Sequence, residues 1–111
     1  LQQVAAILQA GVRSTDVVAR MGGEEFIVLM PNTPRAGAFA VAEKLRNALR
    51  ARPLGVMERL VPVTASFGIT GLAPHQRASI AVLYGQADQA LYLAKSNGRD
   101  RVECVEVTPL G

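Results

Sequence analysis

Two adjacent glycines between apolar segments constrain the fold of this chain more than any other feature of its sequence. Gly22 and Gly23 separate the short apolar segment 17–21 from the continuous apolar run 26–30. Glycine adopts the positive φ angles of a tight turn at little cost, so two such segments joined by a Gly-Gly pair are typical of a β-hairpin. The sequence therefore predicts an antiparallel pair of strands in its first third.

Helical periodicity lies on both sides of this hairpin. Apolar residues recur at three- and four-residue spacing over residues 1–11, which predicts a helix that ends near Gly11. For the helix after the hairpin, Thr33 is the predicted N-cap, with Pro34 as its first residue and Pro53 as its stop.

The second half of the chain predicts one more helix and two strands. The helix spans residues 80–95 and is stopped by Gly98. Apolar residues alternate with small or polar ones over residues 61–69, which predicts a single strand with one buried face, and residues 101–107 form a closing strand. The order of elements indicates an α+β fold in which helices pack on a largely antiparallel sheet. A chain of 111 residues is expected to form one domain.

Composition narrows the classes of function. The net charge of +3 suits an anionic ligand such as a nucleotide, but the basic residues do not cluster as a DNA-binding surface requires, so no nucleic-acid polymer is expected as a partner. Cys104 is the only cysteine and His75 the only histidine, which excludes an intrachain disulfide and a zinc site, and favours a reducing, cytoplasmic location. No apolar run is long enough to span a membrane, so this domain is expected to make no membrane contact.

The hairpin carries two carboxylates directly after its glycines. A Gly-Gly turn followed by glutamates is, by itself, typical of a solvated loop. It can also bind a nucleotide, because the missing Cβ atoms let a ligand lie against the backbone while a carboxylate holds Mg²⁺ over the phosphates. The residues concerned are Gly22-Gly23-Glu24-Glu25-Phe26.

Arg13 and Asp16 are three residues apart, shortly before the hairpin. Such a pair is common at the surface of a helix end. Its chemistry also suits guanine, because arginine can bind O6 and N7 as a fork while a carboxylate accepts hydrogen bonds from N1–H and the amino group. The pair is therefore a candidate guanine clamp.

Lys95 and Arg99 are four residues apart at the end of the last predicted helix. Cations in this position stabilise a helix by interacting with its negative C-terminal end. They are also candidates for binding phosphate, because an anion at a helix C-terminus needs such cations to offset the repulsion.

Three segments together resemble the GGDEF family of diguanylate cyclase domains in their order and spacing. They are Arg20-Met21-Gly22-Gly23-Glu24-Glu25-Phe26, Thr64-Ala65-Ser66-Phe67-Gly68-Ile69, and the run ADQALYLAKSNGRDRV at 87–102. The resemblance covers nearly the whole chain. It implies a fold similar to the palm of class III nucleotide cyclases, a ferredoxin-like arrangement of helices on a mainly antiparallel sheet.

The resemblance also implies an activity. Members of the family condense two GTP molecules into cyclic di-GMP and release pyrophosphate. Two domains face each other in the reaction, which implies a homodimer. By resemblance, the substrate lies against Gly22 and Gly23, a Mg²⁺ or Mn²⁺ ion binds Glu24 with Glu25 as a second carboxylate nearby, and the terminal phosphates meet Lys95 and Arg99.

A second site is implied by the same resemblance. Arg13 and Asp16 match the family's inhibitory site, where cyclic di-GMP binds and holds two domains in an unproductive arrangement. That site often includes an arginine from the helix after the hairpin. Here Lys44 occupies the place, with Arg46 nearby, and lysine lacks the planar fork of arginine.

Other parts of the family pattern do not occur in these residues. The pattern includes an opening strand with a second metal-binding aspartate and the first part of a helix with an asparagine and an aspartate that read guanine. Since the chain also starts within a helical pattern and without Met, we expect residues 1–111 to be the C-terminal two-thirds of a GGDEF domain. The expected fragment has little or no cyclase activity, and its parent carries an upstream sensor domain and could be anchored in a membrane.

Two further functions fit the same residues. The chain could bind cyclic di-GMP through Arg13 and Asp16 without catalysis, or bind GTP as a regulatory or dimerising domain attached to a phosphodiesterase. The intact pair Glu24-Glu25 favours a catalytic domain over both, because a degenerate domain would be expected to lose a metal ligand.

Overall fold

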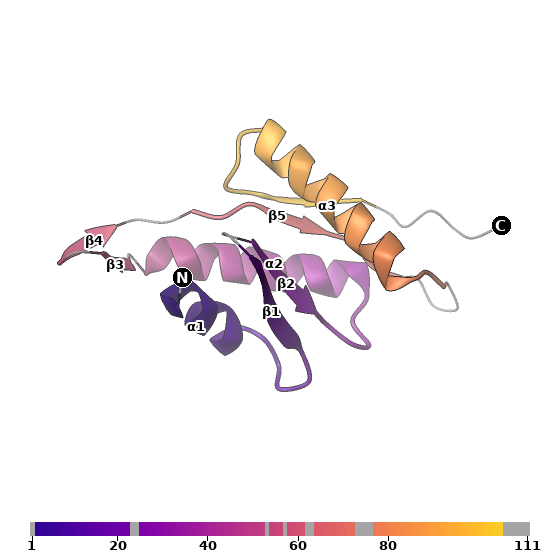
Figure 1. Ribbon diagram of the computed structural model, residues 1–111, viewed down its shortest axis with the longest axis horizontal. Helices are drawn as coiled ribbons and strands as arrows, with labels where there is room; N and C mark the ends of the chain where they lie inside the picture. The colour runs from indigo at the N-terminus through magenta and orange to yellow at the C-terminus, as the bar shows by residue number, and fades with distance from the viewer. Residues whose placement is uncertain are drawn as a thin grey trace.

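The computed structural model describes residues 2–22, 25–52, 54–56, 58–61, 64–72 and 77–105. Within these ranges the chain forms helices and strands in the order predicted, with one additional small hairpin (Figure 1). The elements are α1 (Gln2–Ala10), β1 (Val17–Gly22), β2 (Glu25–Leu29), α2 (Arg35–Ala51), β3 (Leu54–Val56), β4 (Arg59–Val61), β5 (Phe67–Ile69), α3 (Ile80–Ser96) and β6 (Val102–Cys104).

The β1–β2 hairpin confirms the prediction made from the two glycines. The strands are antiparallel, with Val17 opposite Leu29 and Arg20 opposite Phe26. The register shifts between Arg20 and Gly22, so that Gly22 lies opposite Glu25 at the end of the pair. Such a shift bends a strand locally and increases its twist.

The prediction of a single strand over residues 61–69 is wrong. Among the described residues of that span, only Val61, the end of β4, and the residues of β5 lie in strands, and residues 64–66 have no regular structure. Residues 62 and 63 lie outside the described part of the chain. The hydroxyl of Ser66 accepts a hydrogen bond from the backbone N–H of Asp100, so this segment is bonded to a turn rather than to a neighbouring strand. Alternation of apolar and polar residues indicates that one face of a segment is buried. It does not show that a neighbouring strand is there to pair with.

The β3–β4 hairpin was not predicted from the sequence. Its strands are three residues long, with Gly55 opposite Leu60. A side chain of α1 holds it in place, because the Gln3 amide donates to the Gly55 carbonyl at 2.8 Å and accepts from the Gly55 N–H at 3.0 Å. The Gln3 amide thus makes the two hydrogen bonds that the backbone of a neighbouring strand would otherwise make to Gly55.

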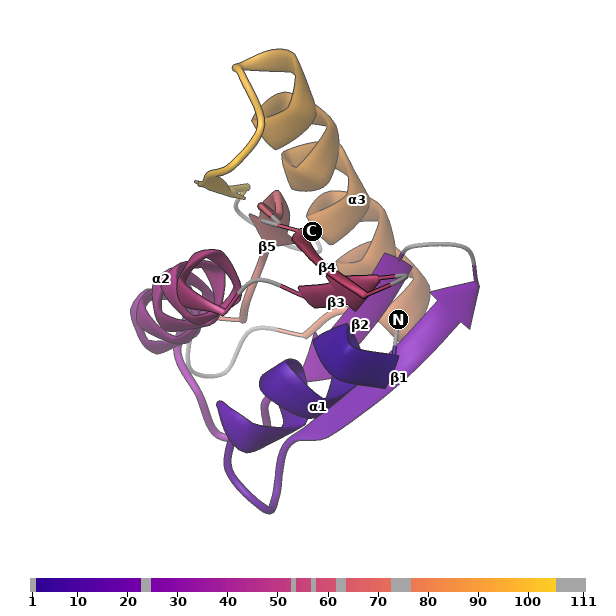
Figure 2. The ribbon, with the colours of Figure 1, turned by 90° about the vertical axis from the view of Figure 1, so that its left-hand side faces the viewer.

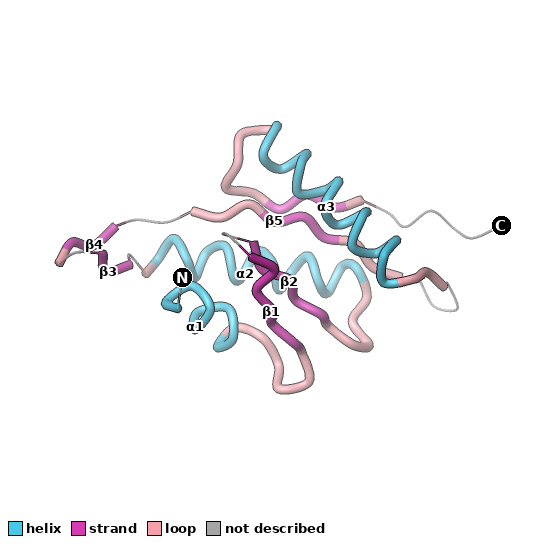
Figure 3. Tube along the Cα trace, in the orientation of Figure 1, coloured by secondary structure: helices cyan, strands magenta, loops and turns pink. Residues whose placement is uncertain are grey.

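β5 and β6 form a parallel pair, which departs from an otherwise antiparallel arrangement of the described strands. A parallel pair requires a long crossover connection, and α3 supplies it. α3 packs on β5 (Figure 3), so closely that a Cβ atom on Gly68 would lie 2.1 Å from the backbone nitrogen of Leu91. The observed end of β6 at Cys104 falls short of the predicted 101–107, of which 106 and 107 are not described.

The start of α2 also differs from the prediction. Pro34, not Thr33, is the N-cap residue, and no side chain caps the helix. The hydroxyl of Thr33 donates to the Pro31 carbonyl at 3.1 Å and accepts from Arg13. The arginine therefore uses the oxygen that was expected to cap the helix.

The core is organised around α2, which packs against α1 on one side and the β5–β6 pair on the other (Figure 2). Towards α1, Leu45 and Leu49 pack with Ile7 and Leu8, and partly buried residues of the hairpin cover them. Towards β5 and β6, the small residues of α2 allow close contact; this second cluster consists of Ala38, Ala42, Ile69 and Val102.

Candidate functional site

A groove of about 390 Å³ runs between the end of α1, the β2–α2 connection and the first turns of α2. We call it the Arg13 groove. Arg13 and Asp16 line it from the loop after α1, Thr33 lines it from the β2–α2 connection, and Lys44 lines it from α2. The structure therefore brings together the residues predicted for a cyclic di-GMP site from separate parts of the chain.

Asp16 is the buried polar residue of this groove, with 5% of its surface exposed. Its carboxylate accepts from the backbone N–H of Arg13 at 2.9 Å, and its other oxygen lies 3.4 Å from Nη2 of Arg13. The backbone N–H of Asp16 in turn donates to the Arg13 carbonyl at 3.0 Å. A buried carboxylate needs such partners, and here they fix the loop that presents Arg13.

Arg13 has an exposed side chain that is held at its tip. Nη2 donates to the Pro31 carbonyl at 3.1 Å and to the hydroxyl of Thr33. The guanidinium is thus fixed between Asp16 and the β2–α2 connection, although its side chain is 59% exposed. An ion pair this exposed adds little stability, so its main consequence is a defined orientation. No local pattern indicated the contact with Thr33, which was predicted to be a helix cap.

Lys44 is exposed on α2 at the edge of the Arg13 groove. Arg46, two residues further along the helix, does not line the groove. Its guanidinium bonds to Glu43 and Asp100 instead. Of the two cations that the sequence offered for this place, only Lys44 is in position.

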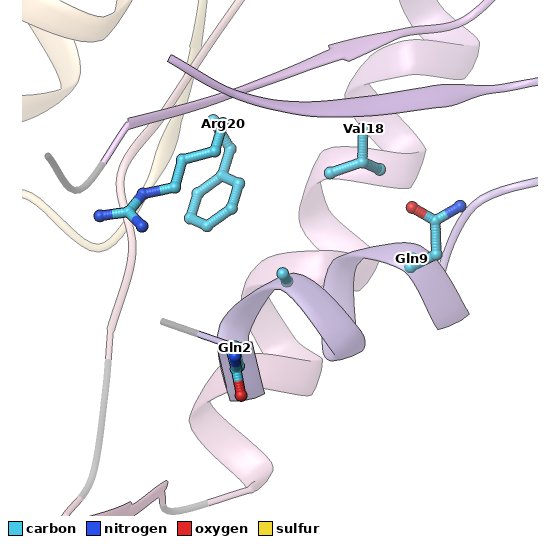
Figure 4. Close-up of a pocket in the computed structure, with 6 residues that line it drawn as sticks. Gln2, Gln9, Val18 and Arg20 are labelled. Carbon is cyan, nitrogen blue, oxygen red and sulfur yellow. The ribbon is translucent and has the colours of Figure 1, made fainter. Parts of the chain in front are cut away.

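A second groove, of about 210 Å³, lies between α1 and the β1–β2 hairpin. Figure 4 shows Arg20 and Val18 projecting from β1, with Gln2 and Gln9 on the facing helix. Phe26 of β2 also lines it, so one wall is apolar. The groove adjoins the end of the hairpin that carries the glycine and glutamate signature.

The signature residues are described in part. Gly22 ends β1, paired with Glu25, which is exposed at the start of β2. Gly23 and the predicted metal ligand Glu24 lie outside the described residues. Within the described ranges, no three Asp, Glu, His or Cys side chains come together to hold a metal ion.

Lys95 and Arg99 lie at the C-terminal end of α3, as predicted. Lys95 is exposed in its last turn, and Arg99 is exposed in the turn that follows Gly98. The backbone N–H of Arg99 donates to the Ala94 carbonyl at 2.9 Å and closes the helix end. α3 makes its contacts with β5 and β6, whereas β1 contacts β2 and α1. The two cations therefore lie on a helix that packs on other strands than those of the β1–β2 hairpin. In the described part of the chain, no helix is both long and apolar enough to cross a bilayer.

Comparison with known sequences identifies relatives over most of the chain. The sequence model of the family described as "Diguanylate cyclase, GGDEF domain" matches residues 1–101. Diguanylate cyclase A of Treponema denticola is 37% identical over 102 residues, which cover 92% of this chain and 27% of the relative. Diguanylate cyclase DgcP of Pseudomonas aeruginosa is 39% identical over 103 residues, or 93% of this chain and 15% of the relative. The chain thus spans less than a third of the length of either protein.

Solved structures show the same arrangement. The active GGEEF domain of a diguanylate cyclase from Vibrio cholerae is similar with a TM-score of 0.78 and 33% identity, covering 99% of this chain and 67% of that one. The GGDEF domain of DgcB from Caulobacter crescentus, in complex with c-di-GMP, is similar with a TM-score of 0.80 and 28% identity, covering 91% and 60%. These similarities confirm the α+β fold.

Proposed function

This chain belongs to the family of diguanylate cyclase GGDEF domains, and from this premise we propose that residues 1–111 are the C-terminal part of such a domain. Its parent protein condenses two GTP molecules into cyclic di-GMP and pyrophosphate, and the product inhibits it. The observation that carries the proposal is the Arg13 groove. It gathers Arg13, Asp16 and Lys44 from two separate elements around a fixed guanidinium.

The chemistry of the Arg13 groove suits a guanine nucleotide with a phosphodiester. The Arg13 guanidinium can bind guanine O6 and N7 as a fork, and its bonds to Asp16 and Pro31 reduce the freedom that it would lose on binding. The ammonium group of Lys44 is a compact positive charge that can pair with a phosphate. DgcB from Caulobacter crescentus, a structural relative, was solved in complex with c-di-GMP.

The catalytic half of the proposal rests on the hairpin and the end of α3. Gly22 and Gly23 would let GTP lie against the backbone, and Lys95 with Arg99 would neutralise its terminal phosphates. Glu24 would hold Mg²⁺ or Mn²⁺, with Glu25 as a second carboxylate nearby, and a metal bound there would supply charge neutralisation at the phosphates. The 3′-hydroxyl of each GTP attacks the α-phosphate of the other, so that two phosphodiester bonds form and a pyrophosphate leaves each α-phosphate. This requires two domains face to face and hence a homodimer.

We expect little or no condensation by these 111 residues alone. By the family resemblance, a second metal-binding aspartate and two guanine-reading residues belong to segments that this sequence does not include. With fewer carboxylates, a hard cation such as Mg²⁺ binds much more weakly. The relatives are much longer than the matched region, which supports a parent with a sensor domain. We place the domain in the cytoplasm on the basis of its single cysteine.

Titration of cyclic di-GMP into this chain tests the proposal. The wild-type chain is expected to bind, and Arg13→Ala is expected to lose about tenfold or more in affinity, because a charge-assisted contact to the base is removed. Arg77→Ala is the matched control, since Arg77 is an exposed arginine outside the groove and should bind like wild type. Equal affinity of wild type and Arg13→Ala would contradict the site.

Assays of GTP turnover separate the enzyme from a binding module. A parent protein that produces cyclic di-GMP from GTP and Mg²⁺ is the expected result. A parent that binds cyclic di-GMP in the Arg13 groove but never turns over GTP would identify a regulatory domain instead. Turnover by the 111 residues alone would contradict the expected inactivity of the fragment.

A further inference from the structure

The turn after α3 adopts a backbone conformation that residues with a Cβ atom rarely take. Gly98 has φ +119°, and the next two residues, Arg99 and Asp100, have φ +61° and +45°. The left-handed region is costly for residues other than glycine, so two consecutive ones there need support from outside the turn. Arg99, the predicted phosphate ligand, lies in the middle of this strained segment.

Asp100 provides that support through all of its hydrogen-bonding groups. Its backbone N–H donates to the Ser66 hydroxyl at 3.1 Å. Its carbonyl and its Oδ1 accept from Nη1 of Arg46, at 3.3 Å and 3.2 Å, and Oδ2 lies 3.6 Å from Nε of Arg50. Residues from α2 and from the segment before β5 therefore converge on a single position of the turn.

Arg46 is itself fixed on α2. Its Nε and Nη2 donate to the two carboxylate oxygens of Glu43 at 3.2 Å and 3.0 Å, and only 16% of its side chain is exposed. The hydrogen bonds to Glu43 and then to Asp100 raise the pKa of Arg46 above its ordinary value. Arg46 is thus a charged, oriented group with one edge on its own helix and the other on the turn.

We propose that Arg46 is a positioning residue for Arg99: by holding Asp100, it keeps the 98–100 turn in the conformation that presents Arg99 to phosphate. The inference rests on the proposed function, in which Arg99 binds the terminal phosphates of GTP. On one side, the backbone of Arg99 is fixed by its bond to Ala94. On the other side, the Arg99 carbonyl accepts from Nε of Arg101 at 3.4 Å, and Asp100 ties the turn to α2 and to Ser66, so release of Asp100 loosens the turn.

The geometry requires an arginine at this position. The planar fork of Arg46 serves Glu43 with two nitrogens and Asp100 with a third, all at the same time. Lysine offers one compact charge and cannot reach both partners in this way. Arg46→Lys therefore keeps the charge of the domain and removes the geometry, which makes it the informative variant.

Binding of inorganic triphosphate by this chain, measured by calorimetry, tests the inference. The probe carries the charges that Lys95 and Arg99 would meet and needs no guanine-reading residues. Arg99→Ala is expected to lose about tenfold in affinity, and Arg46→Lys to lose nearly as much. The double variant should bind like Arg99→Ala alone, because Arg46 acts only through Arg99. Arg52→Lys, the same substitution on an exposed side chain at the end of α2, is the control and should lose less than twofold.

A second measurement does not depend on any ligand. Hydrogen exchange of the Arg99 and Asp100 backbone amides should speed up in Arg46→Lys, while the amides of α1 and the β1–β2 hairpin keep wild-type rates. Asp100→Asn, which retains the backbone acceptor and weakens the ion pair, should show a smaller change of the same kind and serves if Arg46→Lys does not fold.

The outcomes separate this inference from the function on which it rests. An unchanged affinity in Arg99→Ala would overturn both, since Arg99 would then bind no phosphate. A loss in Arg99→Ala without one in Arg46→Lys would overturn the positioning role alone. So would additive losses in the double variant, or unchanged exchange of the Arg99 and Asp100 amides.

Discussion

The two candidate sites of this domain are built in different ways. The Arg13 groove is formed by residues that lie within 35 positions of one another, around α1, the hairpin and α2. The residues predicted for the catalytic site are divided, with Gly22 and Glu25 on the hairpin and Lys95 and Arg99 at the end of α3. The first site is held by its own hydrogen bonds, whereas the second depends on how α3 is placed on β5 and β6. A local site can therefore survive changes that disable the divided one.

Gly68→Ala is expected to have the largest effect on this difference. The added Cβ would meet backbone atoms of α3, at 2.1 Å from the Leu91 nitrogen and 2.3 Å from the Ala87 oxygen, and neither can move without shifting the helix. Such overpacking costs up to about 3 kcal/mol of the free energy of unfolding, or somewhat more. Urea unfolding measures the loss. At urea concentrations below the unfolding transition of the variant, cyclic di-GMP should still bind in the Arg13 groove, while the affinity for triphosphate at the end of α3 falls.

Gly85→Ala is the matched control for that variant. Gly85 lies within α3, and a Cβ added there meets no atom within 4 Å. Because alanine favours the helix over glycine, this variant should gain about 0.5–1 kcal/mol in the free energy of unfolding. If both variants were destabilised equally, close packing of α3 on β5 would not be the cause.

Asp16→Ala is expected to affect mainly the Arg13 groove. The substitution leaves the backbone N–H of Arg13 without its 2.9 Å partner and releases one bond of the guanidinium. We expect a loss of about 1–3 kcal/mol in the free energy of unfolding, together with roughly tenfold weaker binding of cyclic di-GMP. Triphosphate affinity at Lys95 and Arg99 should stay at the wild-type value. A fall in both affinities would show that the two sites are not independent.

The sequence predicted those parts of the fold that local signals determine. The β1–β2 hairpin, α2 and α3 follow from a glycine pair and from apolar periodicity, and Gly98 ends α3 as expected. The misses all involve contacts between distant residues. Gln3 bonds to Gly55 across 52 positions and holds a hairpin that no local pattern indicated. Gly68 fitted an alternating strand pattern, yet its position is set by the backbone of α3.

The candidate sites show the same division. Arg13 and Asp16 could be proposed from their spacing, because the bonds between them span three residues. The roles of Thr33 and Arg46 could not, because each depends on a partner at least 20 residues away. A hydroxyl before a proline predicted a helix cap, and Arg46 was noted only as a cation near Lys44. The partners of such side chains depend on the three-dimensional arrangement of distant residues, which the spacing of residues in the sequence does not show.

Thr33→Val tests whether the hydroxyl that holds Arg13 prepares the groove for its ligand. The variant removes the acceptor on the β2–α2 connection and keeps the size of the side chain. Since Arg13 would then have to be ordered on binding, cyclic di-GMP affinity should fall by about three- to tenfold. Thr33→Ser retains the hydroxyl and should bind like wild type. Tighter binding by Thr33→Val would mean the opposite, namely that Thr33 competes with the ligand for the guanidinium.

Lys44→Arg is expected to have the smallest effect, and it should be a gain. Lys44 stands at the edge of the Arg13 groove, where the family often has an arginine. A planar guanidinium can bind a phosphate through two hydrogen bonds where an ammonium acts as a point charge, so cyclic di-GMP affinity should rise by about two- to fivefold. Arg46 bonds to Glu43 and Asp100 and cannot take over this role, so the gain should be absent from a variant that places the new arginine elsewhere on α2, such as Asn47→Arg. An unchanged affinity in Lys44→Arg would place the phosphates of the ligand away from α2 and restrict the site to Arg13, Asp16 and the β2–α2 connection.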